Sequence, residues 1–507
     1  MRWTTLLLTL CLAASVVGCR QTPAPTSQAH AIAWREGDVD DALAEARESG
    51  KPVMLYWGAR WCPPCNQIKS TLFKDPAFIA ETEHFIPVHL DGDSPGAQRW
   101  GERFGISGYP TVIVLRPDGS EVTRLSNGAA ERLPAVLRAT AARTTSIEAL
   151  FDEAEKNPSA LSPDDWRLLA AFDWRNDPKH FGGEGGAGTL LERLAAAAPP
   201  GELKRRFALL ALVNEAEAGP DGNYSLSAAQ QARIAEVLPA ILANPEEVIA
   251  NRQELSDEMP SLVAALPDAQ LRAKLGASLV AALGHVADDA SLPLPDRLAT
   301  VNADVTLAKA GGAPVPAAVL AKVRARVAFV DQAATDPMVR QSVISDAADL
   351  LHEAGDDAGA KRLLEAELKR SAAPYYYMLD LASLAEDEKD GPAAIAWAKK
   401  AYETAQGPAT RVQWAIDYSK TVMRQAPSDK AAVETSAEAV IDELGKDPGG
   451  YYQRTRIKVG KWGALVRSWS EAHGGSAVLE RLDQRMAGVC ARQGEAAATC
   501  LKWTQAA

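Results

Sequence analysis

The sequence contains no concentration of basic residues. Its 54 Lys and Arg residues are outnumbered by 66 Asp and Glu residues, the formal net charge is −12, and no Lys/Arg-rich run occurs anywhere. Because a nucleic-acid backbone requires a basic surface, we expect no nucleic-acid partner. The seven histidines are mostly scattered singly. No glycine-rich stretch continues into Gly-Lys-Ser or Gly-Lys-Thr, so the sequence predicts neither a metal site nor a phosphate-binding loop.

The apolar run near the N-terminus is too short to cross a membrane. It covers residues 6–17 and is followed by Gly18-Cys19, whereas a transmembrane helix needs about 20 apolar residues. We therefore interpret residues 1–18 as an export signal. Val16-Val17-Gly18-Cys19 resembles the lipobox of bacterial lipoproteins, which implies that Cys19 is lipidated and anchors the chain. An ordinary secretory signal with an incidental cysteine is the alternative.

The residues that follow Cys19 predict a tether and a location. Residues 19–33 are rich in Pro, Thr, Ser, Gln and Ala without apolar periodicity, which is typical of a segment with little structure. If the host has two membranes, Arg20 stands where an aspartate usually retains lipoproteins at the inner membrane. This favours the outer membrane, with the protein facing the periplasm.

Cysteine is scarce, and the six cysteines fall into distinct groups. Cys11 lies in the signal and Cys19 in the lipobox, which leaves two pairs at positions 62, 65, 490 and 500. Two pairs suit an oxidising compartment. On one straight helix Cys490 and Cys500 would lie about 15 Å apart, too far to bond, but Gly494 allows a turn between them. We predict a structural disulfide that closes a terminal helical hairpin. A second redox pair that relays electrons to the first is the alternative.

Hydrophobic periodicity divides the chain into two parts. Over residues 34–142, strand-like apolar runs at 52–58, 84–91, 111–116 and 121–125 alternate with helical patterns at 39–49, 62–72 and 96–104 and a last helix after Gly128, which predicts a compact α/β domain. Over residues 145–507, Ala- and Leu-rich segments with helical spacing predict an all-α domain of helical hairpins. Leu351, Ala360 and Leu364 are matched 34 residues later by Ala385, Ala394 and Ala398, a period that resembles tetratricopeptide repeats and predicts an α-solenoid.

The first cysteine pair lies where a predicted strand passes into a predicted helix. Thiol-disulfide exchange needs one thiolate that attacks and a second thiol that resolves the mixed disulfide. A helix N-terminus stabilises the thiolate of Cys62, while Cys65, one turn further on, is shielded. Pro63 and Pro64 suit the first turn, where a missing N–H costs nothing. A zinc half-site and a permanent structural disulfide are the alternatives.

Three stretches carry a resemblance to a known family. Residues 51–62 (KPVMLYWGARWC), 71–76 (TLFKDP) and 108–111 (GYPT) resemble the thioredoxin superfamily, most closely thiol:disulfide interchange domains of the DsbD C-terminal type. The resemblance covers residues 34–142 and implies a thioredoxin fold. It also implies that Cys62 is the nucleophile, that Cys65 is the resolving thiol, and that Pro110 is a cis-proline against the dithiol, with Tyr109 and Trp61 beside the substrate groove.

The same resemblance implies chemistry, partners and one departure. It implies no cofactor beyond the Cys62–Cys65 disulfide, envelope protein disulfides as substrates, and a membrane thiol reductase as electron donor. Tyr56 stands where the family carries a buried carboxylate, and Pro87 where it carries a lysine. Deprotonation of Cys65 therefore needs water or another base.

Two hypotheses for the function follow. The first is a membrane-anchored periplasmic thiol-disulfide oxidoreductase. Pro64 before the second cysteine is similar to reducing thioredoxins and favours reduction. The second is a non-catalytic envelope binding or chaperone module in which the helical array recruits partners. Aromatic residues at 375–377, 397 and 414 could line a groove for a partner peptide, but packing between hairpins is the interpretation we favour.

Overall fold

The computed structural model describes residues 31–37, 39–60, 62–125, 132–141, 143–182, 186–216, 219, 224–448 and 450–505. The predicted signal peptide and Cys19 lie outside the described residues, as does Trp61. Within the described part, no helix is long and apolar enough to span a membrane.

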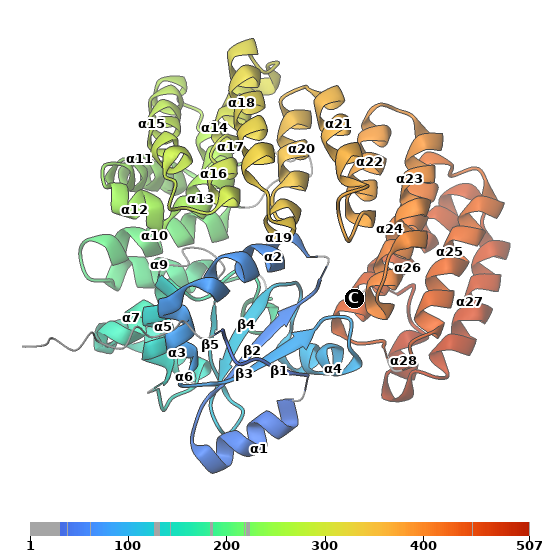
Figure 1. The fold of residues 1–507 in the computed structure, drawn as a ribbon, viewed down its shortest axis with the longest axis horizontal. Coiled ribbons are helices and arrows are strands. Elements are labelled where there is room, and N and C mark those ends of the chain that lie inside the picture. Colours follow the sequence, from blue (N-terminus) through green and yellow to red (C-terminus); the bar gives the residue numbers. More distant parts are fainter. Residues whose placement is uncertain are drawn as a thin grey trace, which may run out of the picture.

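A five-stranded mixed sheet forms the centre of the N-terminal part (Figure 1). The order is β1-β3-β2-β4-β5; β1 and β2 run parallel to β3, whereas β4 runs antiparallel to both β2 and β5. The predicted α/β domain with a thioredoxin fold is confirmed, although the short β1 was not anticipated. The strands are β1 Arg35–Glu36, β2 Val53–Gly58, β3 Ile86–Asp91, β4 Thr111–Leu115 and β5 Glu121–Leu125.

The remainder of the described chain is helical, as the sequence predicted. The helices are α1 Val39–Ser49, α2 Pro63–Ser70, α3 Pro76–Thr82, α4 Pro95–Phe104, α5 Leu133–Ala141, α6 Ile147–Lys156, α7 Pro163–Ala170, α8 Pro178–Phe181, α9 Gly188–Ala197, α10 Glu202–Glu215, α11 Ala228–Leu242, α12 Pro245–Ala250, α13 Arg252–Asp257, α14 Met259–Ala264, α15 Ala269–Asp288, α16 Leu294–Ala299, α17 Asn302–Ala308, α18 Ala317–Ala333, α19 Pro337–Gln341, α20 Ile344–Glu353, α21 Asp357–Glu367, α22 Tyr375–Asp387, α23 Gly391–Thr404, α24 Pro408–Gln425, α25 Lys430–Gly445, α26 Gln453–His473, α27 Ser476–Cys490 and α28 Ala497–Cys500.

Helices cover both faces of the sheet. The apolar side chains of α1 and α4 form one cluster with Val53, Leu55 and Trp57 of β2, whereas those of α2, α3 and α5 pack with Met54 and Tyr56. Successive side chains of a strand point to opposite faces, so β2 contributes to both halves of the core. This places the β2–α2 connection, and with it the cysteine pair, at one end of the central strand.

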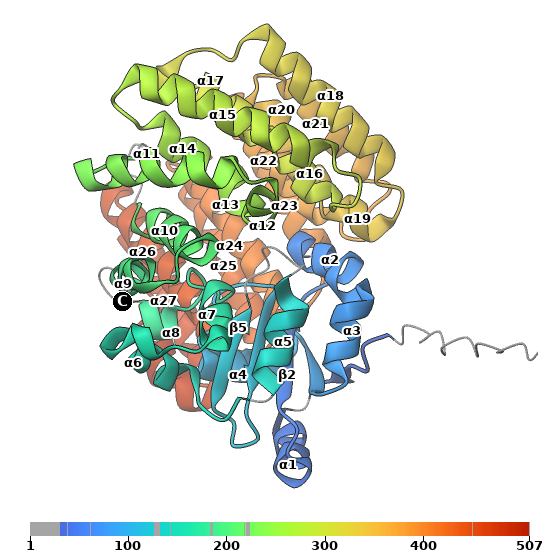
Figure 2. The same cartoon turned by 90° about the vertical axis from the view of Figure 1, so that its left-hand side faces the viewer.

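The later helices form an arc of antiparallel hairpins around the α/β unit, which we call the helical array (residues 145–505; Figures 1 and 2). Two of these hairpins, α20–α21 and α22–α23, explain the 34-residue echo. Asp356 and Asp390 cap α21 and α23 by accepting a backbone N–H, and each follows a residue with positive φ, Gly355 or Lys389. Repetition of the same turn and cap is the structural basis of the period; kinship with tetratricopeptide repeats stays a prediction.

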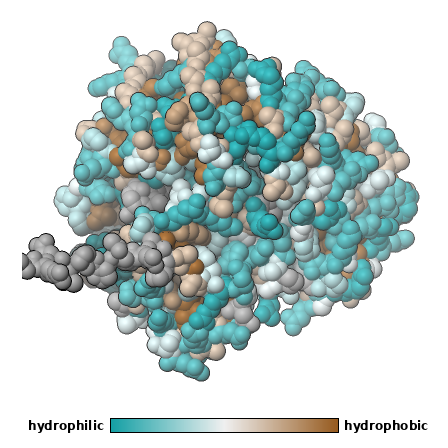
Figure 3. All heavy atoms as spheres, viewed as in Figure 1, coloured by the Kyte–Doolittle hydropathy of each residue, from teal (hydrophilic) through white to brown (hydrophobic). Residues whose placement is uncertain are grey.

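The aromatic residues of α22 and α24 pack inside the array. Tyr375, Tyr377 and Trp414 are buried, and the rings of Tyr375 and Trp414 lie 5.3 Å apart. This confirms core packing for these residues. On the face shown in Figure 3, hydrophilic residues predominate over the C-terminal helices.

The sheet and the first helices of the array share one core. Residues of β4 and β5 belong to the same buried cluster as residues of α6, α7, α9 and α10, and Leu125 forms a β-bridge with Phe172. This core crosses the predicted boundary at residues 142–145. The division of the chain into two domains at this boundary stays a prediction.

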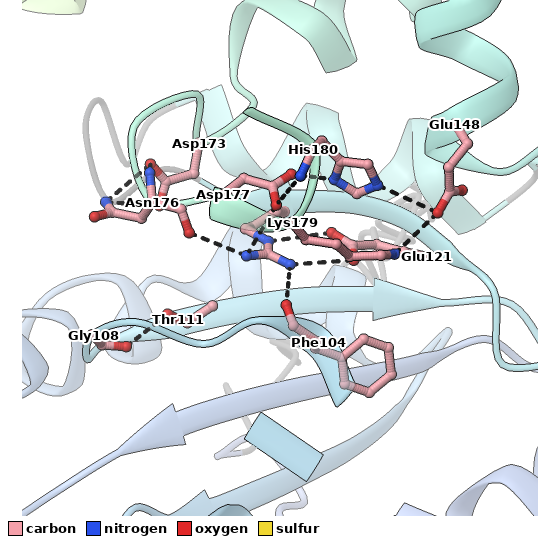
Figure 4. A network of polar contacts seen from close by, with 11 residues as sticks. Phe104, Gly108, Thr111, Glu121, Glu148, Asp173, Asn176, Asp177, Lys179 and His180 are labelled. Atoms are coloured by element: carbon pink, nitrogen blue, oxygen red, sulfur yellow. Dashed lines mark hydrogen bonds and ion pairs between the residues drawn. The ribbon is translucent and has the colours of Figure 1, made fainter. Parts of the chain in front are cut away.

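A buried ionic network fixes the same junction (Figure 4). The Arg124 side chain is 0% exposed and pairs with Glu121 of its own strand and with Asp177 at the start of α8. Its guanidinium also donates to the carbonyl oxygens of Phe104 (2.7 Å) and Asn176 (3.1 Å). Burial raises the pKa of Glu121 despite the positive charge of Arg124. The network therefore joins α4, β5 and α8 through one guanidinium.

Candidate active site

The two cysteines lie at the N-terminus of α2 and are joined in a disulfide. Cys62 is the N-cap residue, and its Sγ accepts a hydrogen bond of 3.2 Å from the backbone N–H of Cys65. Pro63 and Pro64 occupy the first two helical positions, where no hydrogen bond is lost. Cys62 is 3% exposed and Cys65 0%. After reduction, the N–H of Cys65 and the helix dipole would stabilise a thiolate on Cys62 rather than on Cys65.

The loop before β4 closes over this disulfide. The peptide bond between Tyr109 and Pro110 is cis, and the carbonyl oxygen of Tyr109 lies 3.7 Å from Cys62 Sγ. The Tyr109 hydroxyl donates to the carbonyl oxygen of Gly92 (3.3 Å) and accepts from the side-chain amide of Gln98 (3.2 Å). The structure thus brings Tyr109 and Pro110 against the cysteine pair, 47 residues away in sequence.

Tyr56 stands at the position where the resemblance implied a buried carboxylate. It is buried in β2, stacks on His89 with ring centroids 5.3 Å apart, and meets Phe73 edge-on at 4.9 Å. Its hydroxyl has no hydrogen-bond partner among the described residues, and burial raises its pKa far above the usual value. A phenol that stays neutral throughout the physiological range is no base for Cys65. The second departure, Pro87, lies in β3 opposite Met54.

The helical array covers α2, the helix that carries the dithiol (Figures 1 and 2). The side-chain amide of Asn66 donates to Gln341 Oε1 of α19 (3.0 Å), and that of Gln67 donates to Asp296 Oδ1 of α16 (3.3 Å). Asn66 is buried by this contact region. No local pattern in the sequence indicates this contact, because the partners are 275 and 229 residues apart.

The array also holds the segment that follows β3. The backbone N–H of Thr410, at the start of α24, donates to Asp93 Oδ1 (2.8 Å). Arg456 of α26 donates to Glu102 Oε1 of α4 (2.6 Å). Contacts on both sides of the dithiol therefore attach the array to the α/β unit.

Beside these contacts, a cavity of about 470 Å³ lies between α2 and the array. Pro64 and Gln67 line it on the side of α2, and Asp257, Asp346 and Asp349 line it on the side of the array. Burial raises the pKa of Asp257 and of Asp346 to about 6. Two carboxyl groups with raised pKa values therefore lie beside α2.

The second cysteine pair is remote from the first. A disulfide joins Cys490 at the end of α27 to Cys500 at the end of α28, and both cysteines are buried. Gly494 lies between them with φ of +56°, a conformation that glycine adopts without strain. The chain turns back at this glycine and brings the two helix ends together.

Comparisons with known proteins place the α/β unit in a family. Residues 39–140 match the family model of the thioredoxin-like domain. Thiol:disulfide interchange protein DsbD 1 of Pseudomonas aeruginosa is 34% identical over 104 residues, 19% of this chain and 18% of that protein. DsbD of Cronobacter sakazakii is 32% identical over 105 residues, 20% and 18% of the two chains.

A solved thioredoxin from Thermus thermophilus shares 27% identity and covers 22% of this chain and 89% of its own, with a TM-score of 0.21. The chain spans less than a fifth of the length of these two DsbD relatives, 18% of each. The family model covers the α/β unit with its cysteine pair. Residues 39–140 of this chain are therefore a thioredoxin-like domain, similar to thiol:disulfide interchange proteins of the DsbD type.

Proposed function

We propose that this chain is a thiol-disulfide oxidoreductase that reduces protein disulfides of the cell envelope. The observation that carries the proposal is the position of Cys62: it caps α2, accepts a hydrogen bond from the Cys65 N–H, and faces the Tyr109 carbonyl. Similarity to thiol:disulfide interchange proteins supports it. The dithiol is the whole redox centre, and no further cofactor takes part.

The reaction has two exchange steps. The Cys62 thiolate attacks one sulfur of a substrate disulfide, forms a mixed disulfide, and releases the other substrate sulfur as a thiolate. Cys65 then loses its proton and attacks Cys62 Sγ, which releases the second substrate thiol and forms the Cys62–Cys65 disulfide. Two electrons from a membrane thiol reductase restore the dithiol. Since Tyr56 is no base, the proton of Cys65 goes to water or to another group.

The proposed location is the periplasmic side of a membrane, reached through a lipid on Cys19. In a host with two membranes we place the chain at the outer one. The lipobox-like sequence and the two disulfides support an oxidising, membrane-attached setting. Cys19→Ser should move the protein from the membrane fraction to the soluble fraction. Unchanged fractionation, together with no incorporation of a labelled fatty acid into the wild type, would contradict the anchor.

Activity is tested on the full chain, because the sheet and the array share one core. With dithiothreitol as electron donor, the protein should accelerate the reduction of insulin disulfides, and Cys62→Ser should abolish the acceleration. Cys65→Ser should accumulate a mixed disulfide with the substrate, visible on a non-reducing gel. A wild-type rate equal to that of dithiothreitol alone would refute the proposal.

The second candidate, a non-catalytic binding or chaperone module, is favoured by one observation. The array contacts α2 directly and leaves Cys62 only 3% exposed. The two candidates differ in whether partner binding remains after both cysteines are replaced. Partner capture by a Cys62→Ser/Cys65→Ser variant, combined with no reductase activity in the wild type, would favour the binding module.

A further inference from the structure

A second cavity adjoins the loop that carries the cis-proline. It has a volume of about 300 Å³ and lies between this loop and two helices of the array, α24 and α26. Ser107 lines it from the loop, and the charged side chains around it are Asp417, Lys420, Arg454, Lys458 and Lys461. We call this cavity the basic pocket, because four cations surround a single carboxylate.

Two of the cations in the basic pocket, Lys458 and Lys461, have no carboxylate partner among the described residues. Lys420 lies 3.4 Å from Asp417, but in the part of the chain that the structure describes no carboxylate is within ion-pair distance of Lys458 or Lys461. The cost of burying its charge, together with the nearby positive charge of Arg454, lowers the pKa of Lys458 to about 8, although the charge of Asp417 opposes this shift. An anion beside Lys458 would relieve this cost.

Other cations of the same array do have acidic partners. Arg481 donates to Glu434 and Arg485 to Asp442, each through two nitrogens. The chain as a whole carries a net charge of −12. Lys458 and Lys461 therefore differ from these paired cations, and their field attracts anions toward this part of the surface.

Arg454 and Tyr109 connect the basic pocket with the reacting sulfur. The guanidinium carbon of Arg454 lies 4.5 Å from the centre of the Tyr109 ring. The carbonyl oxygen of Tyr109 in turn lies 3.7 Å from Cys62 Sγ. A group bound in the pocket thus sits beside the loop against which a substrate disulfide has to be presented.

The pocket is open to solvent and partly apolar. Ile457 is 40% exposed, and Lys461 and Ser107 are also exposed. Ile416 and Trp462 add apolar surface to the lining. This combination suits the methylene stem and the carboxylate of glutamate better than a fully hydrated inorganic anion.

We propose that the basic pocket binds an acidic segment of the substrate polypeptide next to the disulfide under attack, so that the array selects substrates by charge. The inference rests on the proposed function, and it adds a substrate class to it. Complementary charges across an interface mainly raise the rate of encounter and exclude partners of the wrong sign. The array would then act as the specificity element and the thioredoxin-like domain as the reactive element.

The test uses three disulfide-bonded peptides that differ only in the residues flanking one cysteine: two Glu, two Gln or two Lys. We expect the full wild-type chain to reduce the Glu peptide with a kcat/KM about tenfold above that of the Gln peptide, and the Lys peptide more slowly than either. Raising the salt concentration from about 50 mM to about 500 mM should bring the three values together.

Variants separate the pocket from general charge effects. Lys458→Gln/Lys461→Gln should reduce the Glu-to-Gln ratio to about one, whereas Lys458→Arg/Lys461→Arg should keep most of it. The matched control is Lys361→Gln/Lys399→Gln, which removes two positive charges from exposed ion pairs with Glu388 and Glu403 elsewhere on the array. This control should retain the tenfold preference.

The outcomes distinguish the inference from the proposed function. Turnover of all three peptides at equal rates, or a preference that survives Lys458→Gln/Lys461→Gln, would overturn the pocket and leave the reductase proposal standing. No turnover of any peptide would refute the reductase. In that case, fluorescence anisotropy with Glu and Gln peptides that carry Ser in place of Cys tests whether the basic pocket binds acidic segments. Tighter binding of the Glu peptide than of the Gln peptide, lost in Lys458→Gln/Lys461→Gln, would support the inference. Equal binding of the two peptides would overturn it.

Discussion

Replacement of Arg124 by Met should destabilise the junction between the sheet and the array strongly. The guanidinium is fully buried, makes two hydrogen bonds to Glu121 (3.2 and 3.3 Å), lies 3.5 Å from Asp177, and donates to two carbonyl oxygens. Met preserves most of the volume but leaves the buried carboxylate of Glu121 without its ion-pair partner and leaves Asp177 with His180 alone. Breaking a buried pair in this way costs about 3–5 kcal/mol of unfolding free energy.

The pH dependence of this loss has a definite sign. Burial already raises the pKa of Glu121, and the positive charge of Arg124 opposes that rise. Without Arg124 the pKa rises further, so protonation neutralises the orphaned carboxyl at mildly acidic pH. When the pKa of a carboxyl group is higher in the folded than in the unfolded protein, the folded protein loses stability as the pH increases toward the folded-state pKa. The deficit of Arg124→Met should therefore be larger at about pH 7.5 than at about pH 5.

Urea denaturation followed by tryptophan fluorescence measures the effect, because Trp174 is buried at this junction and packs on Phe172 at 5.2 Å. The control is Arg116→Met in the β4–β5 turn. The ion pair of Arg116 with Asp118 has an N–O distance of 3.2 Å and is partly exposed, so it should contribute about 0–1 kcal/mol to stability. A loss no greater than that of the control, or one of equal size at both pH values, would refute this account of the network.

Two further replacements test the array itself. Cys490→Ser/Cys500→Ser should lower the stability of the C-terminal helices, measured by amide hydrogen exchange, by about 2–3 kcal/mol. Insulin reduction should be unchanged. Lost turnover without destabilisation would instead identify the distal pair as an electron relay. Gln341→Ala removes the acceptor of the Asn66 amide. Because a lost hydrogen bond weakens the contact between the array and α2 by about 1 kcal/mol, reduced Cys62 should be alkylated roughly fivefold faster. An unchanged alkylation rate would mean that this contact does not hold the array over α2.

Local sequence patterns determined the thioredoxin-like unit. β2 and β4 are continuous apolar runs, typical of strands buried on both faces, and Pro117-Asp118-Gly119 supplies the turn between β4 and β5 with residues suited to it. The cysteine pair and the Gly-Tyr-Pro-Thr segment are each contiguous motifs whose residue types fix their backbone conformation. Helix α3 was missed, although Asp75 before Pro76 caps it by accepting the Phe78 N–H at 2.7 Å.

What surrounds the dithiol was decided only by the tertiary structure. The partners of Asn66 and Gln67 lie more than 200 residues away, and helical periodicity indicates that a helix buries one face without indicating against what. Arg124 illustrates the same limit within a strand. A charged residue in an alternating strand suggests a solvent-facing position, but α8 and its flanking segment cover β5. Asp177 and the carbonyl oxygen of Asn176 bind the buried guanidinium, whose burial without partners would be strongly unfavourable. Charge pairing across such separations depends on how the chain folds back on itself, which no local pattern encodes.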